Sequence, residues 1–379
     1  MGFAARAPRF REDEWVQACV VLKTGATIGI LGGGQLARML ALAAAPLGLR
    51  CHVYSPEKES CAFEVVHAYT CAGYEDENAL AGFADAVDVI TYEFENVPAR
   101  TAAFLSTCKP VLPDPRVLEI TQDRLEEKNF ISALKIATAP YAPVHSASQL
   151  AEGLEKIGVP AVLKTRRLGY DGKGQAKILK AADANAAWRA LHDVPCILEG
   201  FIAFEREVSV IAARGADGDV QCFEVTENEH RDHILHTSRV PAKASPALAA
   251  EARRVAARIA KAFDYVGALG VEMFVVRAKG KEHVLVNEIA PRVHNSGHWT
   301  IDGATVSQFE QHIRAVAGLP LAKPVRLGRK VEMVNLIGDE VEDYARWLSV
   351  PGAAIHVYGK GRPSPRRKMG HVTRIWPAK

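Results

Sequence analysis

The sequence predicts a mixed fold: an α/β domain first, an α+β domain after it, and a small C-terminal module. Two observations carry this prediction. Between Thr27 and Glu93, short apolar strands alternate with helical stretches, a pattern typical of a doubly wound parallel sheet. From about Thr121 to Gly318 the predicted strands include hairpins between helices, which indicates α+β packing. A chain of 379 residues is long enough for two or three domains.

We expect four parts along the chain. They are an N-terminal extension (1–24), the first domain (25–120), the second domain (121–318) and the C-terminal module (319–379). Pro110, Pro113 and Pro115 separate the first two domains. From Pro351 to the end there are seven Lys or Arg residues and no acid. Without interleaved aromatic residues, this basic stretch favours one phosphate group over RNA as its ligand.

Composition excludes several classes of protein. Hydrophobic residues make up 48% and charged residues 24% of the chain, as in ordinary globular proteins. The net charge of +3 is too small for a protein whose main partner is nucleic acid. Apolar runs are too short for a membrane span, and residues 1–14 lack the apolar core of a secretory signal. Seven cysteines without a C-x-x-C pair favour free thiols and a cytoplasmic location.

The first domain opens with a strand, a glycine turn and a helix. Thr27–Leu31 is a short apolar run, and Gln35–Ala45, rich in Leu, Met and Ala, follows three glycines. Gly32, Gly34 and Ala37 match G-x-G-x-x-A, which binds a dinucleotide pyrophosphate in some α/β folds. The acid expected about 20 residues later is misplaced, because the nearest one follows a proline. A packing turn or another phosphate ligand is therefore favoured over NAD.

A second glycine cluster, Gly169–Gln175, follows a predicted strand. Lys164, Arg166, Arg167 and Lys173 surround it, so the loop is suited to covering a polyphosphate, although its spacing is not that of a P-loop. The alternative is a solvated turn with ordinary surface charges. The other expected elements are strands at Arg50–Tyr54, Asp88–Glu93, Ala161–Thr165, Cys196–Leu198, Glu207–Ala212, Val271–Val276 and Val284–Ile289, and helices at Asp123–Leu134 and Ala247–Phe263.

Two glutamates carry the strongest physical argument. If the last two of those strands form a hairpin symmetric about Gly280, Glu272 faces Glu288 and Phe274 faces Val286. Two carboxylates roughly 5 Å apart repel by about 3 kcal/mol at an effective dielectric near 20. A good cross-strand pair contributes only about 0.2–1 kcal/mol. The pair therefore predicts a bound proton or cation, with Mg²⁺ the natural candidate. A shifted register that leaves both acids in water is the alternative.

The loop after this hairpin is dense in polar residues. Arg292 can hold a carboxylate or phosphate through two parallel hydrogen bonds, and His294 and Asn295 can stabilise an anionic intermediate. Satisfied loop histidines are the alternative reading of His294. A zinc site is not expected at the three histidines spaced by three, because on a strand they point to opposite faces; they are His230, His233 and His236.

Five motifs resemble the ATP-grasp superfamily and, within it, the 5-(carboxyamino)imidazole ribonucleotide synthases of purine biosynthesis. The motifs are Gly32–Leu36, Tyr92–Pro98, Lys164–Arg167, Gly169–Gln175 and Asn287–Thr300. The resemblance implies a pre-ATP-grasp domain followed by an ATP-grasp domain. It also implies a homodimer that uses ATP and Mg²⁺. Such enzymes phosphorylate bicarbonate and transfer the resulting carboxyl group to the amine of 5-aminoimidazole ribonucleotide.

The resemblance also assigns residues to roles. ATP contacts fall on Arg124, Lys164, Gly169, Tyr170, Asp171, Gly172, Lys173, Gly174, Gln175, Glu199, Gly200, Phe201, Ile202, Glu207, His230, Asn287 and Glu288. In this set Glu199 and Ile202 bracket an adenine-reading strand and Glu207 holds the ribose. Metal ligands fall on Glu272 and Glu288, and ribonucleotide contacts on Tyr170, Asp171, Lys360 and Arg367, with Arg366 as an alternative to Arg367. Catalytic roles fall on Arg292, His294, Asn295 and Ser296, with Asp171 a candidate base.

Three other functions remain as alternatives. Another ATP-grasp ligase, such as formate-dependent glycinamide ribonucleotide transformylase, shares the ATP site, and the loop Arg292–Trp299 and the basic tail argue against it by resemblance. An NAD-dependent oxidoreductase leaves the paired glutamates unexplained. A non-catalytic nucleotide sensor is disfavoured because the expected polar residues are present.

Overall fold

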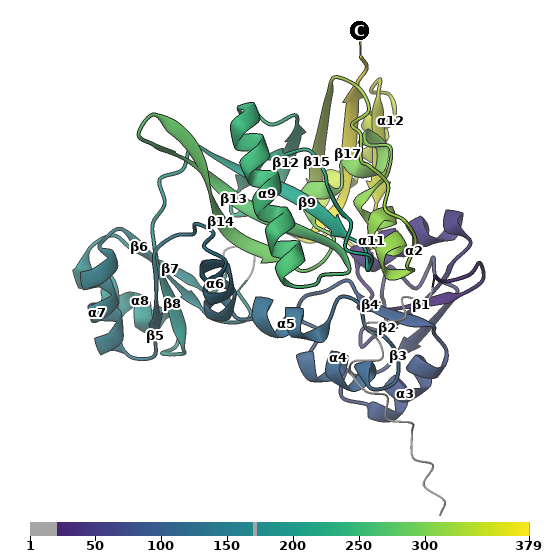
Figure 1. Cartoon of the computed structure of the whole chain (residues 1–379), viewed down its shortest axis with the longest axis horizontal. Helices are drawn as coiled ribbons and strands as arrows, with labels where there is room; N and C mark the ends of the chain where they lie inside the picture. Colours follow the sequence, from purple (N-terminus) through teal and green to yellow (C-terminus); the bar gives the residue numbers. More distant parts are fainter. Residues whose placement is uncertain (1–20, 170–172, 379) are drawn as a thin grey trace, which may run out of the picture.

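The computed structural model describes residues 21–169 and 173–378. Figure 1 shows three regions along the chain. The purple-to-blue N-terminal domain lies at the lower right, a small teal sheet lies at the left, and a large green-to-yellow sheet lies above both. The expected extension 1–24 falls almost wholly outside the described residues.

The N-terminal domain is the predicted parallel sheet. Its strands run in the order β3-β2-β1-β4, and every adjacent pair is parallel. Its elements are β1 (Thr27–Leu31), α2 (Gln35–Ala44), β2 (Arg50–Ser55), β3 (Ala68–Cys71), α3 (Glu77–Asp85), β4 (Val89–Tyr92), α4 (Ala99–Ser106) and α5 (Pro115–Thr121). Strand β3 was not predicted. It is a four-residue edge strand with alternating exposure, too short to stand out as an apolar run.

One hydrophobic core joins this domain to the next. Helix α2 packs against α11 (Gln308–Val316), and the buried side chains of Leu36 and Leu40 share a cluster with Phe309 and Ile313. At the same boundary the Thr91 hydroxyl lies 2.8 Å from Nε2 of the buried His312. The carboxyl ends of β1 and β4 are therefore fixed against the second domain.

The second domain begins with α6 and a small antiparallel sheet, in the order β5-β8-β6-β7. Its elements are α6 (Arg124–Ala133), β5 (Tyr141–Val144), α7 (Ala147–Ile157), β6 (Ala161–Thr165), β7 (Gln175–Ile178), α8 (Ala184–Ala190) and β8 (Cys196–Gly200). Helices α7 and α8 supply the apolar side chains that cover the sheet. Strand β6 ends at the second glycine cluster, as the sequence predicts.

The large sheet has nine strands. The path runs β14-β13-β9-β11-β12-β15-β17-β16, and β10 pairs with β9. The elements are β9 (Arg206–Arg214), β10 (Val220–Cys222), β11 (Thr226–Arg231), β12 (Ile234–Val240), α9 (Pro246–Ala262), β13 (Gly267–Ala278), β14 (Lys281–Ala290), α10 (Thr300–Gly303), α11, β15 (Lys330–Ile337), α12 (Tyr344–Leu348), β16 (Ala353–Val357) and β17 (Lys368–Trp376). The C-terminal strands extend the sheet of the second domain through the β12–β15 pairing. No helix in the described ranges is long and apolar enough to cross a membrane.

The hairpin of β13 and β14 pairs Glu272 with Glu288, as predicted, but the register of the rest of the hairpin differs from the predicted one. The turn consists of two residues, Lys279 and Gly280, both with positive φ, so Phe274 pairs with Leu285 and not with Val286. A bulge next to Glu272 then shifts the register by one residue. The assumed symmetry about Gly280 was wrong, and the bulge restores the opposition of the two acids.

Candidate active site

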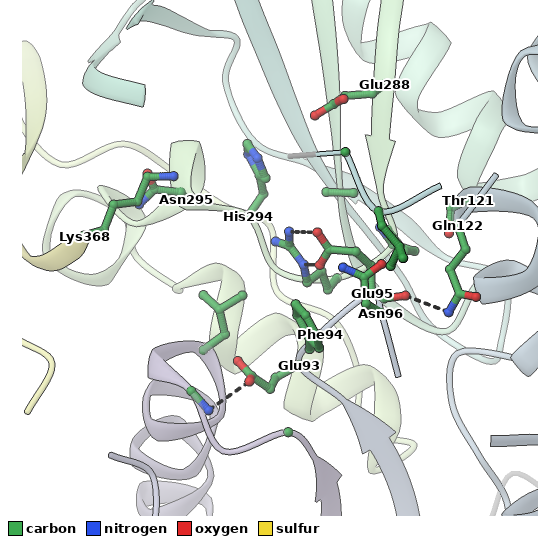
Figure 2. A pocket seen from close by; sticks show the side chains of 18 of the residues that line it. Glu93, Phe94, Glu95, Asn96, Thr121, Gln122, Glu288, His294, Asn295 and Lys368 are labelled. Atoms are coloured by element: carbon green, nitrogen blue, oxygen red, sulfur yellow. Dashed lines mark hydrogen bonds and ion pairs between the residues drawn. The ribbon is translucent and has the colours of Figure 1, made fainter. Parts of the chain in front are cut away.

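A cavity of about 940 Å³ lies where the N-terminal domain, the two sheets of the second domain and the C-terminal strands meet. In Figure 2, Glu288, His294 and Asn295 surround it on one side and the segment Glu93–Asn96 on the other. Fourteen of the predicted site residues line it: Arg124, Lys164, Gly169, Gln175, Glu207, His230, Glu272, Asn287, Glu288, Arg292, His294, Asn295, Lys360 and Arg367.

Other predicted residues lie elsewhere. Tyr170, Asp171 and Gly172 are outside the described residues, and Lys173, Gly174 and Ser296 do not line the cavity. The strand segment Glu199–Ile202 does not line it either. The Glu199 carboxylate turns inward to Lys164, with Oε2 3.0 Å from Nζ. The Phe201 amide is already bonded to Pro160 O, 3.1 Å away.

The facing acids Glu272 and Glu288 have unequal surroundings. Desolvation and the charge of Glu288 raise the pKa of Glu272. Desolvation also opposes ionisation of Glu288, but the cations Arg124 and Lys164 outweigh it and hold its pKa below the usual value. Arg124 Nη1 lies 3.2 Å from Glu288 Oε2. Arg124 therefore compensates Glu288, whereas the charge that most perturbs Glu272 is another acid.

This pair fits Mg²⁺, which proteins bind through one or two carboxylates together with phosphate oxygens. Within residues 21–169 and 173–378, no group of three or more His, Cys, Asp or Glu side chains can hold a metal. A cation at Glu272 and Glu288 would thus take its remaining oxygens from other groups, such as water and a bound phosphate. The three spaced histidines form no such group, and His230 Nδ1 instead lies 2.6 Å from Glu207 Oε2.

Strand β14 is held in place by a buried lysine, Lys128, that was not predicted as a site residue. Lys128 on α6 is only 2% exposed, and its ammonium donates to Asn287 O at 2.7 Å and to Thr138 Oγ1 at 2.9 Å. Its Nζ also lies 3.9 Å from Glu199 Oε2. Lys128 therefore ties the peptide next to Glu288 to helix α6, and the Glu199 carboxylate faces two lysines, Lys128 and Lys164.

Arg292 was predicted to hold a bound anion through its two-nitrogen fork, and the structure shows that fork occupied. Its Nε and Nη2 both bond the carboxylate of Glu95, with the Nη2–Oε1 distance 2.7 Å. Nη1 donates to Val293 O at 3.1 Å. The charge of Glu95 overcomes burial and raises the pKa of Arg292. Glu95 therefore occupies the Nε and Nη2 side of the guanidinium, and a substrate oxygen can be met only by the remaining N–H bonds of Nη1 and Nη2. The predicted contact of Arg292 with a substrate anion stays a prediction.

Asn295 is held by a second amide. Its Nδ2 donates to Asn335 Oδ1 at 3.0 Å, and Asn335 Nδ2 donates back to Asn295 Oδ1 at 2.6 Å. This reciprocal pair ties the loop to β15. Next to it, burial lowers the pKa of His294 to about 3, and its Nε2 lies 3.2 Å from Glu272 Oε1.

The first glycine motif binds a protein carboxylate. Glu93, at the end of β4, accepts hydrogen bonds from Gly34 N at 2.9 Å and Ala37 N at 3.3 Å. A Cβ at Gly32 would approach the Glu93 side chain to 2.7 Å, so the glycine is required for this contact. These are amides that would bind a dinucleotide pyrophosphate. The structure therefore disfavours the NAD alternative on physical grounds.

The basic C-terminal stretch brings two cations to the cavity. Lys360 and Arg367 line it and lie together, with Arg367 Nη1 3.3 Å from Lys360 O. Burial and the charge of Arg367 lower the pKa of Lys360 to about 8. Arg366 donates instead to Asp232 O at 3.2 Å. Geometry therefore favours Arg367 over Arg366 as the phosphate ligand.

No role was predicted for Glu93 and Glu95, although both lie in the motif Tyr92–Pro98. One signal was available: two acids follow β4 at the carboxyl end of a parallel sheet, where α/β domains bind ligands. Gln122 was also missed. Its side chain donates to Glu95 O at 2.8 Å and to Val97 O at 2.7 Å, which holds this segment in place.

Three family models match the chain in order. They are a ribonucleotide synthetase preATP-grasp domain at residues 25–122, an ATP-grasp domain at 129–309, and a phosphoribosylaminoimidazole carboxylase C-terminal domain at 332–378. With the cavity between these parts, they define an ATP-grasp enzyme with a pre-ATP-grasp domain. The fold prediction is confirmed.

Comparison with individual proteins identifies the family within the ATP-grasp enzymes. The chain is 50% identical to the N5-carboxyaminoimidazole ribonucleotide synthase of Brucella melitensis, over 94% of this chain and 98% of that protein. An ADP complex of N5-carboxyaminoimidazole ribonucleotide synthetase superposes with a TM-score of 0.89 at 41% identity, covering 93% of each chain. The Aspergillus clavatus enzyme with ADP and 5-aminoimidazole ribonucleotide gives 0.84 at 30% identity, covering 94% of this chain and 95% of that one. The chain belongs to the family of N5-carboxyaminoimidazole ribonucleotide synthases.

Proposed function

We propose that this protein carboxylates 5-aminoimidazole ribonucleotide with ATP and bicarbonate, giving N5-carboxyaminoimidazole ribonucleotide, ADP and phosphate in purine biosynthesis. The cavity carries the proposal, because it joins two facing acids, an Arg–His–Asn loop and a basic cluster suited to a phosphate. A bicarbonate oxygen attacks the γ-phosphorus and ADP leaves. The amine then attacks the carboxyl carbon, and phosphate leaves.

The ATP half of the reaction falls on α6, β6 and the Glu272–Glu288 pair. Arg124 and Lys164 present cations to the phosphates, and Glu207, paired with His230, is placed to hold the ribose. Mg²⁺ at Glu272 and Glu288 supplies charge stabilisation to the transferring phosphoryl group when bound. The glycine loop Gly169–Gln175 is assigned to covering the phosphates, with Tyr170 and Asp171 toward the aminoimidazole.

The adenine strand Glu199–Ile202 stays a prediction. In this structure Glu199 is engaged with Lys164, so its backbone would read adenine while its side chain orients a cation. Gly200 is assigned to the same strand. Lys173 and Gly174 are assigned to the covering loop.

The carboxylation half falls on the loop after β14 and the C-terminal strands. Arg292, steered by Glu95, presents its remaining N–H bonds to bicarbonate and carboxyphosphate, and His294 and Asn295 face the same space. Lys360 and Arg367 bind the ribonucleotide phosphate. Ser296 does not line the cavity but contacts Nδ1 of His294, so it acts through His294. Carboxyphosphate hydrolyses readily in water, so this function requires that water be kept from the cavity during the reaction.

Further expectations accompany this function. We expect a homodimer, as the family resemblance implies, and a cytoplasmic location, which the described cysteines fit because none forms a disulfide. The domain limits 25–120, 121–318 and 319–379 remain our division of the chain. The match to the carboxylase C-terminal domain supports this function over formate-dependent transformylation.

Release of ADP tests the function. Protein with ATP, Mg²⁺ and bicarbonate should release ADP several-fold faster when 5-aminoimidazole ribonucleotide is added, with its amine consumed in step. The control replaces this ribonucleotide by ribose 5-phosphate, which should not stimulate. ADP release that is indifferent to the amine would leave an ATP-grasp enzyme with another substrate.

A further inference from the structure

A chain of buried hydrogen bonds ends on the inner face of His294. Ser209 on β9, Asn228 on β11, Ser238 on β12 and Ser296 are at most 7% exposed. Asn228 bonds the Ser238 and Ser209 hydroxyls at 2.8 and 2.9 Å. Ser209 Oγ lies 2.7 Å from Ser296 Oγ, which lies 2.9 Å from His294 Nδ1.

One backbone amide fixes the direction of this chain. Ser296 N lies 3.3 Å from His294 Nδ1, and a peptide nitrogen can only donate, so Nδ1 accepts. The Ser296 hydroxyl must then donate to Nδ1 as well, and its oxygen must accept from Ser209. The single hydroxyl proton of Ser209 is used in this bond, so the Ser209 oxygen accepts from the Asn228 amide. The Asn228 oxygen in turn accepts from Ser238.

The consequence appears on the other face of the ring. With Nδ1 accepting from two donors, the proton of the neutral ring sits on Nε2. Nε2 lies 3.2 Å from Glu272 Oε1 and faces the cavity. The backbone of His294 is fixed separately, since its N donates to Gln308 Oε1 at 2.9 Å and its O accepts from Gln308 Nε2 at 2.7 Å. The ring therefore presents one N–H to the acid pair and its ligands.

We propose that Asn228, Ser209 and Ser296 are positioning residues that hold His294 in the Nε2-protonated tautomer, so that His294 donates a hydrogen bond from Nε2 to an oxygen in the cavity. The oxygen belongs to an anion of the carboxylate or phosphate class or to the Glu272 carboxylate. The role in turnover rests on the proposed function, whereas the tautomer can be measured without it.

Nitrogen NMR of the resting protein labelled with ¹⁵N-histidine tests the tautomer. The His294 resonances are those missing from His294→Gln. We expect an unprotonated Nδ1 and a protonated Nε2, and a protonated Nδ1 would overturn the proposal. This measurement needs no substrate, so it stands even if the carboxylation assay fails.

Two variants test the positioning role. Ser296→Ala removes the hydroxyl donor at 2.9 Å and leaves Nδ1 only the longer backbone contact at 3.3 Å. We expect a measurable fraction of the Nδ1-protonated tautomer to appear and kcat to fall about tenfold, with KM for ATP little changed. Ser238→Ala is the matched control, because it changes the end of the series farthest from His294 and leaves the Ser296 hydroxyl in place. It should leave the tautomer unchanged and kcat within about twofold of the parent value. Equal losses in both variants with an unchanged tautomer would refute the role.

A second pair of variants tests donation from the Nε2 position. Gln at position 294 can place an amide N–H near the native Nε2, whereas the shorter Asn reaches only the level of Nδ1. We expect His294→Gln to retain about ten times the kcat of His294→Asn. Equal inactivity of the two would mean that an N–H at the Nε2 position is not what His294 contributes, contrary to the proposal.

Discussion

Replacing Glu95 by Gln tests whether a contact between domains orients Arg292. The carboxylate comes from the segment after β4, and the guanidinium from the loop after β14, so the pair crosses the domain boundary. Arg292 and Glu95 are 17% and 29% exposed. Gln keeps one acceptor oxygen but loses the charge and the second hydrogen bond.

The cost can be worked from this geometry. Removing one partner of a buried ion pair costs about 3–5 kcal/mol, because the other charge is left uncompensated. The remaining exposure to the cavity and the oxygen kept by Gln reduce this, and we expect about 2 kcal/mol. At roughly 2 °C per kcal/mol for a large chain, the melting temperature falls by about 4 °C. We also expect kcat/KM for bicarbonate to fall at least about tenfold, since Arg292 loses its fixed orientation.

Glu205→Gln is the matched control. Glu205 also binds an arginine through two bonds, at 2.7 and 3.2 Å to Arg277, but that pair is on the surface, with side chains 35% and 50% exposed. Its melting temperature and kinetics should match the parent protein, because such pairs contribute little. Circular dichroism melts and ADP release at varied bicarbonate measure both variants. If the two behave alike, the reasoning about Glu95 is refuted.

Three other predictions follow from charges in the structure. Glu288→Gln should abolish ATP turnover by breaking the facing acid pair, while Glu282→Gln on the same strand should not; full activity of the first would exclude the metal role. Because burial and Arg367 lower the pKa of Lys360 to about 8, the Lys360 charge is lost above that pH, and KM for the ribonucleotide should rise there. Lys360→Arg keeps its charge and should remove the rise. An equal rise in the parent protein and in Lys360→Arg would contradict the phosphate-binding role of Lys360. Burial lowers the pKa values of several histidines below the usual 6.5, among them His298 and His371 and, to about 4, His312. The unfolded chain therefore binds more protons than the folded one below about pH 6.5, and stability falls as pH falls, with His312 alone contributing about 1.4 kcal/mol per pH unit between about pH 6.5 and 4. Melting temperatures measured across this pH range test the prediction. The melting temperature of His312→Gln should fall less steeply with falling pH than that of the parent protein.

The sequence predicted the elements well where burial produces a simple pattern. Strands β1, β2 and β4 are buried along nearly their whole length and appear as apolar runs. The acid pair Glu272 and Glu288 was also found, although the turn and the bulge were not. The turn is centred between Lys279 and Gly280 instead of on Gly280, and the one-residue bulge cancels this offset. Neither feature can be recognised in the alternation of apolar residues.

Side-chain pairing could not be predicted to the same degree. Arg292 was read as a ligand for a substrate anion because its guanidinium suits one, but Glu95, which satisfies it, lies 197 positions away. Asn335 holds Asn295 from 40 positions away. The sequence identifies which groups can pair, whereas the tertiary fold decides which partner each one meets.

The charges around the cavity favour Glu272 as a ligand of the proposed cation. Glu95 is compensated by Arg292 and Glu199 by Lys164, and Glu93 accepts hydrogen bonds from the amides of Gly34 and Ala37. Glu272 faces another acid and contacts His294, and the charges of His230 and Lys368 offset its burial only in part. An imidazolium there would compensate the carboxylate and compete with a cation. In the proposed tautomer, a neutral ring that donates only one N–H orients Glu272 without neutralising it and leaves the negative charge of the pair to the proposed metal ion.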